Sequence, residues 1–167
     1  MAAVEALSRW LHATRLSWAM AGGYPWLWPA CETLHFIGMA LLVGIVGLID
    51  LRMLGFLRSL PLKPLDRLLP WGILGFVINT VTGLLFFTGD PFQYIHNLVF
   101  WLKMAFILLA GLNVGAFYLT GLHRRVTSVG AEEDVPLSAK LVAAASLFLW
   151  IGVMYWGRML PFLGEAF

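Results

Sequence analysis

The stretch that decides the fold is Trp28–Leu54, which reads WPACETLHFIGMALLVGIVGLIDLRML. A helix rises about 1.5 Å per residue, so roughly 20 apolar residues cross the hydrocarbon core of a bilayer. This stretch is therefore long enough to span a membrane. It also carries Glu32 and His35 near its start, and ionisable side chains inside such segments are rare and usually functional. The stretch predicts a membrane helix with a candidate site near one end.

The composition of the whole chain agrees with this prediction. Of its 167 residues, 60% are hydrophobic and 12% are charged, and the mean hydropathy is +0.84. Soluble domains carry about 25% charged residues, so a polytopic membrane protein is expected. A single cysteine excludes an internal disulfide. Because no basic run or aromatic ladder is present, we expect no nucleic-acid partner.

Proline, glycine and charged residues divide the rest of the chain into further apolar segments. We predict an all-α fold, a four-helix up-down bundle that spans the membrane and occupies residues 24–167. The expected transmembrane helices cover residues 29–54, 70–88, 91–122 and 137–160.

Residues 1–23 predict a separate amphipathic helix. Apolar residues recur at helical spacing from Val4 to Trp18, and polar residues fall between them. Such a helix usually lies in the membrane interface. Tyr24, Trp26 and Trp28 follow it, and aromatic residues of this kind gather at membrane edges.

The basic residues predict the orientation. They are concentrated in the loops after the first and third predicted helices, at residues 52–67 and 124–140. Loops rich in Lys and Arg stay in the cytoplasm. We therefore expect a multi-pass protein of the bacterial inner membrane with both termini in the periplasm.

Five polar residues fall in the expected periplasmic half of the bundle: Glu32, His35, His96, Lys103 and Arg158. His35 and His96 lie roughly 8–9 Å below their expected helix starts. The two helices run in the same direction and should face each other diagonally. Two histidines at equal depth can hold one b-type haem between them. Lys103 and Arg158 would neutralise its propionates or pair with Glu32.

Other interpretations of these residues remain open. Each polar side chain can instead be hydrogen-bonded within the bundle or reach outward to the interface. Cys31, Glu32, His35 and Met39 together offer ligands that suit Cu(I), which makes copper the alternative cofactor. A di-metal carboxylate site needs two Glu-x-x-His copies, and only one is present.

Two strips of small residues suggest surfaces for close helix contact. One strip comprises Ala40, Gly44 and Gly47, and the other comprises Gly72, Gly75, Asn79 and Gly83. They favour either packing within the bundle or the binding of partner helices.

The pattern ETLHFIGMALLVG, IDLRMLG, PWGILGF, TGLLFF and KMAFILLAGLN resembles a family of small, largely uncharacterised bacterial inner-membrane proteins with four predicted helices. At greater distance the chain looks like the membrane domain of the copper-resistance D type and like b-type cytochrome subunits. The first resemblance implies fold and location but supplies no activity.

We therefore expect a membrane anchor and electron-transfer subunit that holds one haem b near the periplasmic face through His35 and His96. It would link a periplasmic or membrane redox partner to the quinone pool. No nucleophile–base pair or nucleotide loop indicates an independent enzyme. A non-redox scaffold of a membrane complex is the second hypothesis, and transport of copper or another metal ion is the third.

Overall fold

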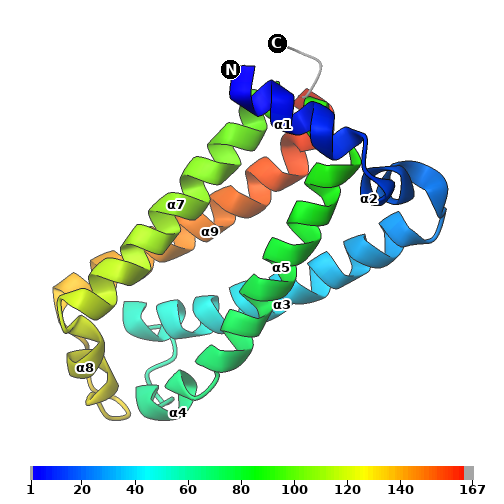
Figure 1. The fold of residues 1–167 in the computed structure, drawn as a ribbon. Helices are drawn as coiled ribbons and strands as arrows, with labels where there is room; N and C mark the ends of the chain where they lie inside the picture. The colour runs from blue at the N-terminus through cyan, green and yellow to red at the C-terminus, as the bar shows by residue number, and fades with distance from the viewer. Residues whose placement is uncertain (1, 164–167) are drawn as a thin grey trace.

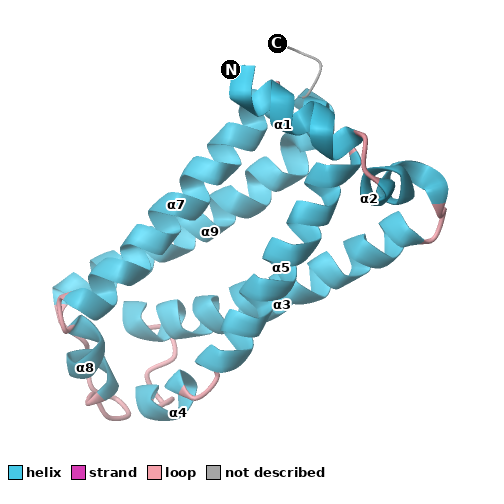
Figure 2. Cartoon of the chain, in the orientation of Figure 1, coloured by secondary structure: helices cyan, strands magenta, loops and turns pink. Residues whose placement is uncertain are grey.

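The computed structural model describes the backbone of residues 2–163 and the side chains of residues 5–163. Every regular element within these residues is a helix (Figure 2). Four helical segments are long and apolar enough to cross a membrane, so the chain is a multi-pass membrane protein. The elements in chain order are α1 (Ala2–His12), α2 (Arg15–Trp18), the π-helical turn η1 (Ala19–Gly23), α3 (Leu27–Leu54), α4 (Leu62–Asp66), α5 (Leu69–Gly89), α6 (Pro91–Ile95), α7 (Leu98–Leu119), α8 (Leu122–Thr127) and α9 (Leu137–Leu163).

The four long helices form two antiparallel pairs. Helix α3 packs along α5, α7 packs along α9, and α3 also contacts α9. These contacts give the order α5, α3, α9 and α7, with α5 and α7 at the two edges. Figure 1 shows α7 beside α9 and α5 crossing α3. We call the end that carries α1, α2 and α6 the N-terminal end, and the end that carries α4 and α8 the loop end.

Glycines set the closest helix crossing, between α3 and α5. A Cβ atom added to Gly75 would lie 2.6 Å from the carbonyl oxygen of Gly38 and 2.7 Å from the backbone nitrogen of Leu42. Only glycine permits this approach, which is the common use of small residues between membrane helices. Part of the strip from Gly72 to Gly83 is thus covered by α3, while Gly83 itself faces open space.

The continuous helix predicted over residues 91–122 is wrong. The helix breaks after α6, and Asn97 begins α7 as its N-cap, with Oδ1 accepting a 2.9 Å hydrogen bond from the Val99 backbone N–H. The Asn97 amide also donates to the Leu160 carbonyl of α9 at 3.1 Å, and its side chain is 2% exposed. Helix α7 then ends at Leu119, and Gly121 takes a left-handed φ of +71°. A buried cap thus replaces the expected helical turn.

The N-terminal segment is also divided where one helix was predicted. Thr14 ends α1 and caps α2 by accepting a hydrogen bond from the Ser17 N–H at 3.2 Å. Helix α1 turns Ser8 toward the bundle, whereas Trp10 is 65% exposed. A small serine allows the close approach of α1 that the large indole would prevent.

Smaller corrections concern the other helix ends. Helix α3 begins two residues before Pro29, α5 extends one residue beyond its predicted bounds at each end, and α9 continues through Pro161 to Leu163.

A single guanidinium organises the loop end. Arg52 is fully buried and donates to three backbone carbonyls, those of Leu60 at 2.6 Å, Gly130 at 3.0 Å and Glu133 at 3.2 Å. The first carbonyl follows α3 and the other two precede α9. Arg52 therefore joins two loops that are far apart in the sequence.

Candidate functional site

His35 is the best-defined polar residue of the expected site. It lies half-buried on α3, and its Nδ1 is 2.7 Å from Oγ1 of Thr82 on α5. The Thr82 hydroxyl donates its only hydrogen to the backbone carbonyl of Ile78 on its own helix, at 2.7 Å. It must therefore accept from His35, whose Nδ1 carries the hydrogen. The lone pair lies on Nε2, which has no hydrogen-bond partner among the described residues.

Aromatic rings surround His35 on the side toward the N-terminal end. Its ring centroid is 5.5 Å from that of Phe86, which in turn lies 4.9 Å from Trp28. The Trp28 indole N–H donates to the Glu32 carboxylate at 3.1 Å. Glu32 is exposed, and its carboxylate bonds to Trp28 on the same helix rather than to His35.

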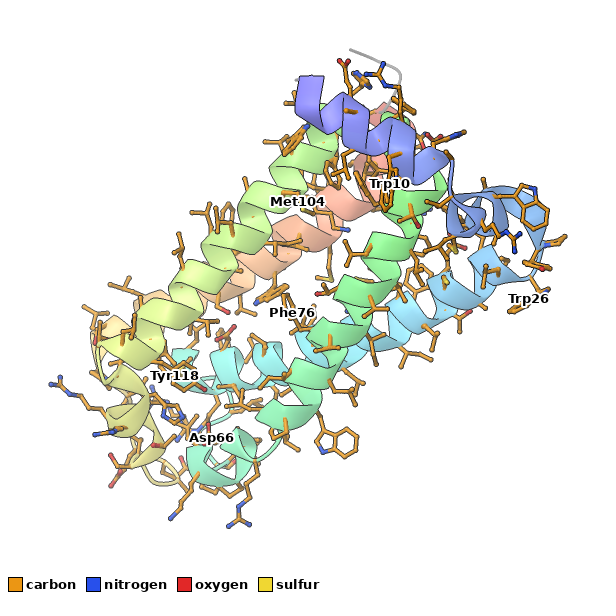
Figure 3. All side chains as sticks on the ribbon, in the orientation of Figure 1. Trp10, Trp26, Asp66, Phe76, Met104 and Tyr118 are labelled. Atoms are coloured by element: carbon orange, nitrogen blue, oxygen red, sulfur yellow. The ribbon has the colours of Figure 1, made fainter. Side chains whose placement is uncertain are left out.

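Lys103 approaches from the other helix pair. It is half-buried on α7, and its Nζ would be 3.4 Å from a Cβ atom added to Gly157 of α9. No carboxylate lies within salt-bridge distance of it among the described residues. It is also within electrostatic range of His35. In Figure 3, the labelled Met104 of α7 and Phe76 of α5 lie between the two helix pairs.

His96 ends α6 and is exposed. Its Nδ1 is 2.9 Å from the Phe92 carbonyl, which can only accept, so this nitrogen also carries the hydrogen. His96 thus has the same tautomer as His35, and its Nε2 has no hydrogen-bond partner in the part of the chain that the structure describes. The two rings are not in contact, because α9 separates α7 from α3 and the break at Asn97 places His96 before the long helix.

Arg158 stands apart from the other four residues. It is exposed, and its guanidinium lies over the Phe162 ring, 5.4 Å from the centroid. Glu32 instead acts on Tyr94 of α6. Burial, together with the charges of Asp90 and Glu32, raises the pKa of Tyr94 to about 12. Lys103 is thus close enough to His35 for its charge to act on the imidazole, whereas His96 and Arg158 lie at the surface.

The residues considered for copper also diverge. Cys31 is buried at 4% exposure, whereas the neighbouring Glu32 is exposed. Within residues 5–163, no group of three or more His, Cys, Asp or Glu side chains gathers at a point where it could hold a metal ion.

Thr82 flanks the glycine strip and was not among the site residues predicted from the sequence. The available signal was its spacing of seven residues from Gly75, which places both on one helix face. Both are buried against α3.

Comparison with known proteins gives a family but no activity. A family model described as "Family of unknown function (DUF6644)" matches residues 19–163, which include the four long helices. No curated protein and no solved structure matches the chain. The matched segment covers most of the chain and every residue of the candidate site, so the protein belongs to the DUF6644 family of unknown function.

Proposed function

We propose that this chain is a membrane anchor and electron-transfer subunit that holds one b-type haem near its N-terminal end, with His35 as an axial ligand. The observation that carries the proposal is the tautomer of His35. Thr82 holds the Nδ1–H and leaves the Nε2 lone pair free. Metal-binding histidines commonly donate their other ring N–H to a fixed acceptor in this way.

His96 would be the second residue that holds the haem, because its Nε2 also has no hydrogen-bond partner among the described residues. A haem between the two histidines would occupy the region between the α3–α5 pair and the α7–α9 pair, with the His96 ring turned inward. Lys103 has no carboxylate partner among the described residues and would neutralise a propionate. Arg158 packs on Phe162 at the surface, so its position does not support the same role.

The proposed location is the bacterial inner membrane, with the N-terminal end in the periplasm. Lys63, Arg67, Arg124 and Arg125 are all exposed at the loop end, as expected for a cytoplasmic surface. The haem would then accept electrons from, or donate them to, a periplasmic or membrane redox partner, and would exchange them with quinone.

The experiment is an absorption spectrum of the detergent-purified protein, produced with haem supplied, in oxidised and dithionite-reduced forms. We expect a Soret band with sharp reduced α and β bands in the wild type. His35→Ala and His96→Ala should each abolish this bis-histidine spectrum. His123→Ala is the matched control, because His123 bonds to Asp66 at the loop end and should leave the spectrum unchanged.

Thr82→Val tests the role of Thr82 as a positioning residue. Valine keeps the shape of threonine but cannot accept the hydrogen bond from His35. The haem should remain bound, and its midpoint potential should shift because the Nδ1–H of His35 no longer has its acceptor. A colourless wild type would refute the haem, and loss of the spectrum in His35→Ala alone would refute His96 as the second ligand.

A structural subunit of a membrane complex is the second candidate. The edge helices favour it, because Gly83 of α5 and both Gly111 and Gly115 of α7 have open space where a side chain would be. Small residues on exposed membrane helices permit close contact with partner helices. A colourless protein that cross-links to a partner through cysteines placed at 83 or 111 would support this candidate over the haem.

A further inference from the structure

The α3–α9 interface contains a buried carboxyl group that the proposed function does not use. Asp50 of α3 is 3% exposed, and Ser146 of α9, which is 5% exposed, is close enough for its hydroxyl to act on the Asp50 carboxyl group. The Oδ2 atom of Asp50 is buried and has no hydrogen-bond partner among the described residues. Buried polar atoms without a partner are few in native proteins, and each requires an explanation.

A second unpartnered group lies in the same interface. Trp150 is one helical turn beyond Ser146 on α9, and it packs in a cluster with Leu42 and Val46 of α3. Val46 is one turn before Asp50. The Trp150 Nε1–H is buried and has no acceptor within residues 5–163. An orphaned acceptor and an orphaned donor therefore occupy neighbouring turns of one packed interface.

Among the described residues, no cation forms a salt bridge with Asp50. Arg52, two residues along α3, donates through Nε and Nη2 to carbonyls of the two loops, and its Nη1 is buried without a partner in the described part of the chain. Lys140, at the start of α9, forms its ion pair with Asp134 at 2.7 Å. Neither basic side chain forms a salt bridge with Asp50. An unpaired buried carboxylate is costly enough that such a group neutralises itself instead.

We propose that Asp50 is a proton-binding site, whose carboxyl group carries a proton at neutral pH inside the α3–α9 interface. Binding adds one proton from water at the loop end to a carboxylate oxygen and breaks no covalent bond. The neutral acid removes the need for a cationic partner. Because this site is separate from His35, its test does not depend on the haem.

The test is infrared spectroscopy of the full chain in detergent or lipid at neutral pH, which distinguishes a protonated carboxyl group from a carboxylate. We expect a carboxylic-acid C=O band in the wild type that disappears in Asp50→Asn. The matched control is Glu32→Gln, which alters an exposed carboxylate and should keep the band. Ser146→Ala should move the band to higher frequency, because a hydrogen bond to the carboxyl group is lost. If Ser146 only filled space in the interface, the same variant would leave the frequency of the band unchanged.

Two outcomes would overturn the proposal. A wild-type spectrum without the acid band at neutral pH would show that Asp50 is ionised. If that band appeared only in Arg52→Met, Asp50 would be the partner of Arg52 in a buried ion pair. A carboxylate band that changed on addition of sodium ions would instead indicate a cation site. Asparagine is nearly isosteric with the neutral acid, so Asp50→Asn should melt within a few degrees of the wild type, which shows that a lost band does not come from misfolding.

Discussion

Replacing Gly75 by alanine should weaken the α3–α5 contact that positions His35. The added Cβ atom would lie 2.6 Å from the Gly38 carbonyl oxygen and 2.7 Å from the Leu42 nitrogen, both backbone atoms. Restoring an ordinary contact distance of 3.4 Å requires α3 and α5 to separate by roughly 0.8 Å. A gap of about that size forfeits a quarter to a half of the dispersion energy of each contact.

The expected cost follows from two opposing terms. Overpacking of this kind costs about 1–3 kcal/mol, and a little more where only backbone can move. Alanine recovers up to about 1 kcal/mol through its better helix propensity. We therefore expect Gly75→Ala to lower the free energy of unfolding by about 2 kcal/mol.

The same helix supplies graded controls. At Gly72 the added atom would meet only the Ile45 side chain, at 3.5 Å, and at Gly83 it would meet nothing within 4 Å. Unfolding in mixed micelles, followed by tryptophan fluorescence, should rank Gly75→Ala as less stable than Gly72→Ala, and Gly83→Ala as the most stable of the three. If Gly75→Ala were as stable as Gly83→Ala, the two backbones would not be in the close contact described.

Three further predictions concern other parts of the bundle. Arg52→Met removes three hydrogen bonds to backbone carbonyls, so it should lower the free energy of unfolding by about 3 kcal/mol or more and expose the joined loops to protease. The control Arg58→Met removes an exposed ion pair and should lower it by less than about 1 kcal/mol. Asn97→Ala removes the α7 cap and the bond to α9 and should cost about 1–2 kcal/mol in the same unfolding assay. The pKa of Tyr94 is raised to about 12 in the folded protein, whereas an unfolded chain loses the same proton near pH 10. The protonated phenol therefore stabilises the fold below pH 10, and this stabilisation should be lost between about pH 10 and pH 12. An ultraviolet titration should show Glu32→Gln lowering that pKa, since a nearby negative charge is removed, and an unchanged value would refute the electrostatic effect of Glu32 on Tyr94.

The sequence by itself determined the number of membrane helices and placed the ends of α3 and α5 within two residues. Long apolar runs are decisive because every backbone polar group in a bilayer must be bonded within its own helix. The break before α7 was also encoded, since Asn97 is a strong N-cap residue in front of an apolar run. However, the residues from His96 to Lys103 continue the helical spacing across this break, so the sequence pattern did not reveal Asn97 as a cap.

Only the tertiary structure decided which faces of the helices meet. A membrane helix is apolar on all sides and lipid is as apolar as a protein core, so hydrophobic periodicity does not mark the inner face. The choice rests on short contacts between residues distant in the chain, such as Gly38 with Gly75 and His35 with Thr82, 47 residues apart. The orphaned oxygen of Asp50 likewise became visible only once α9 was placed against α3. The sequence therefore identifies the polar residues of the membrane helices, but the pairing of the helices determines which of these residues face one another.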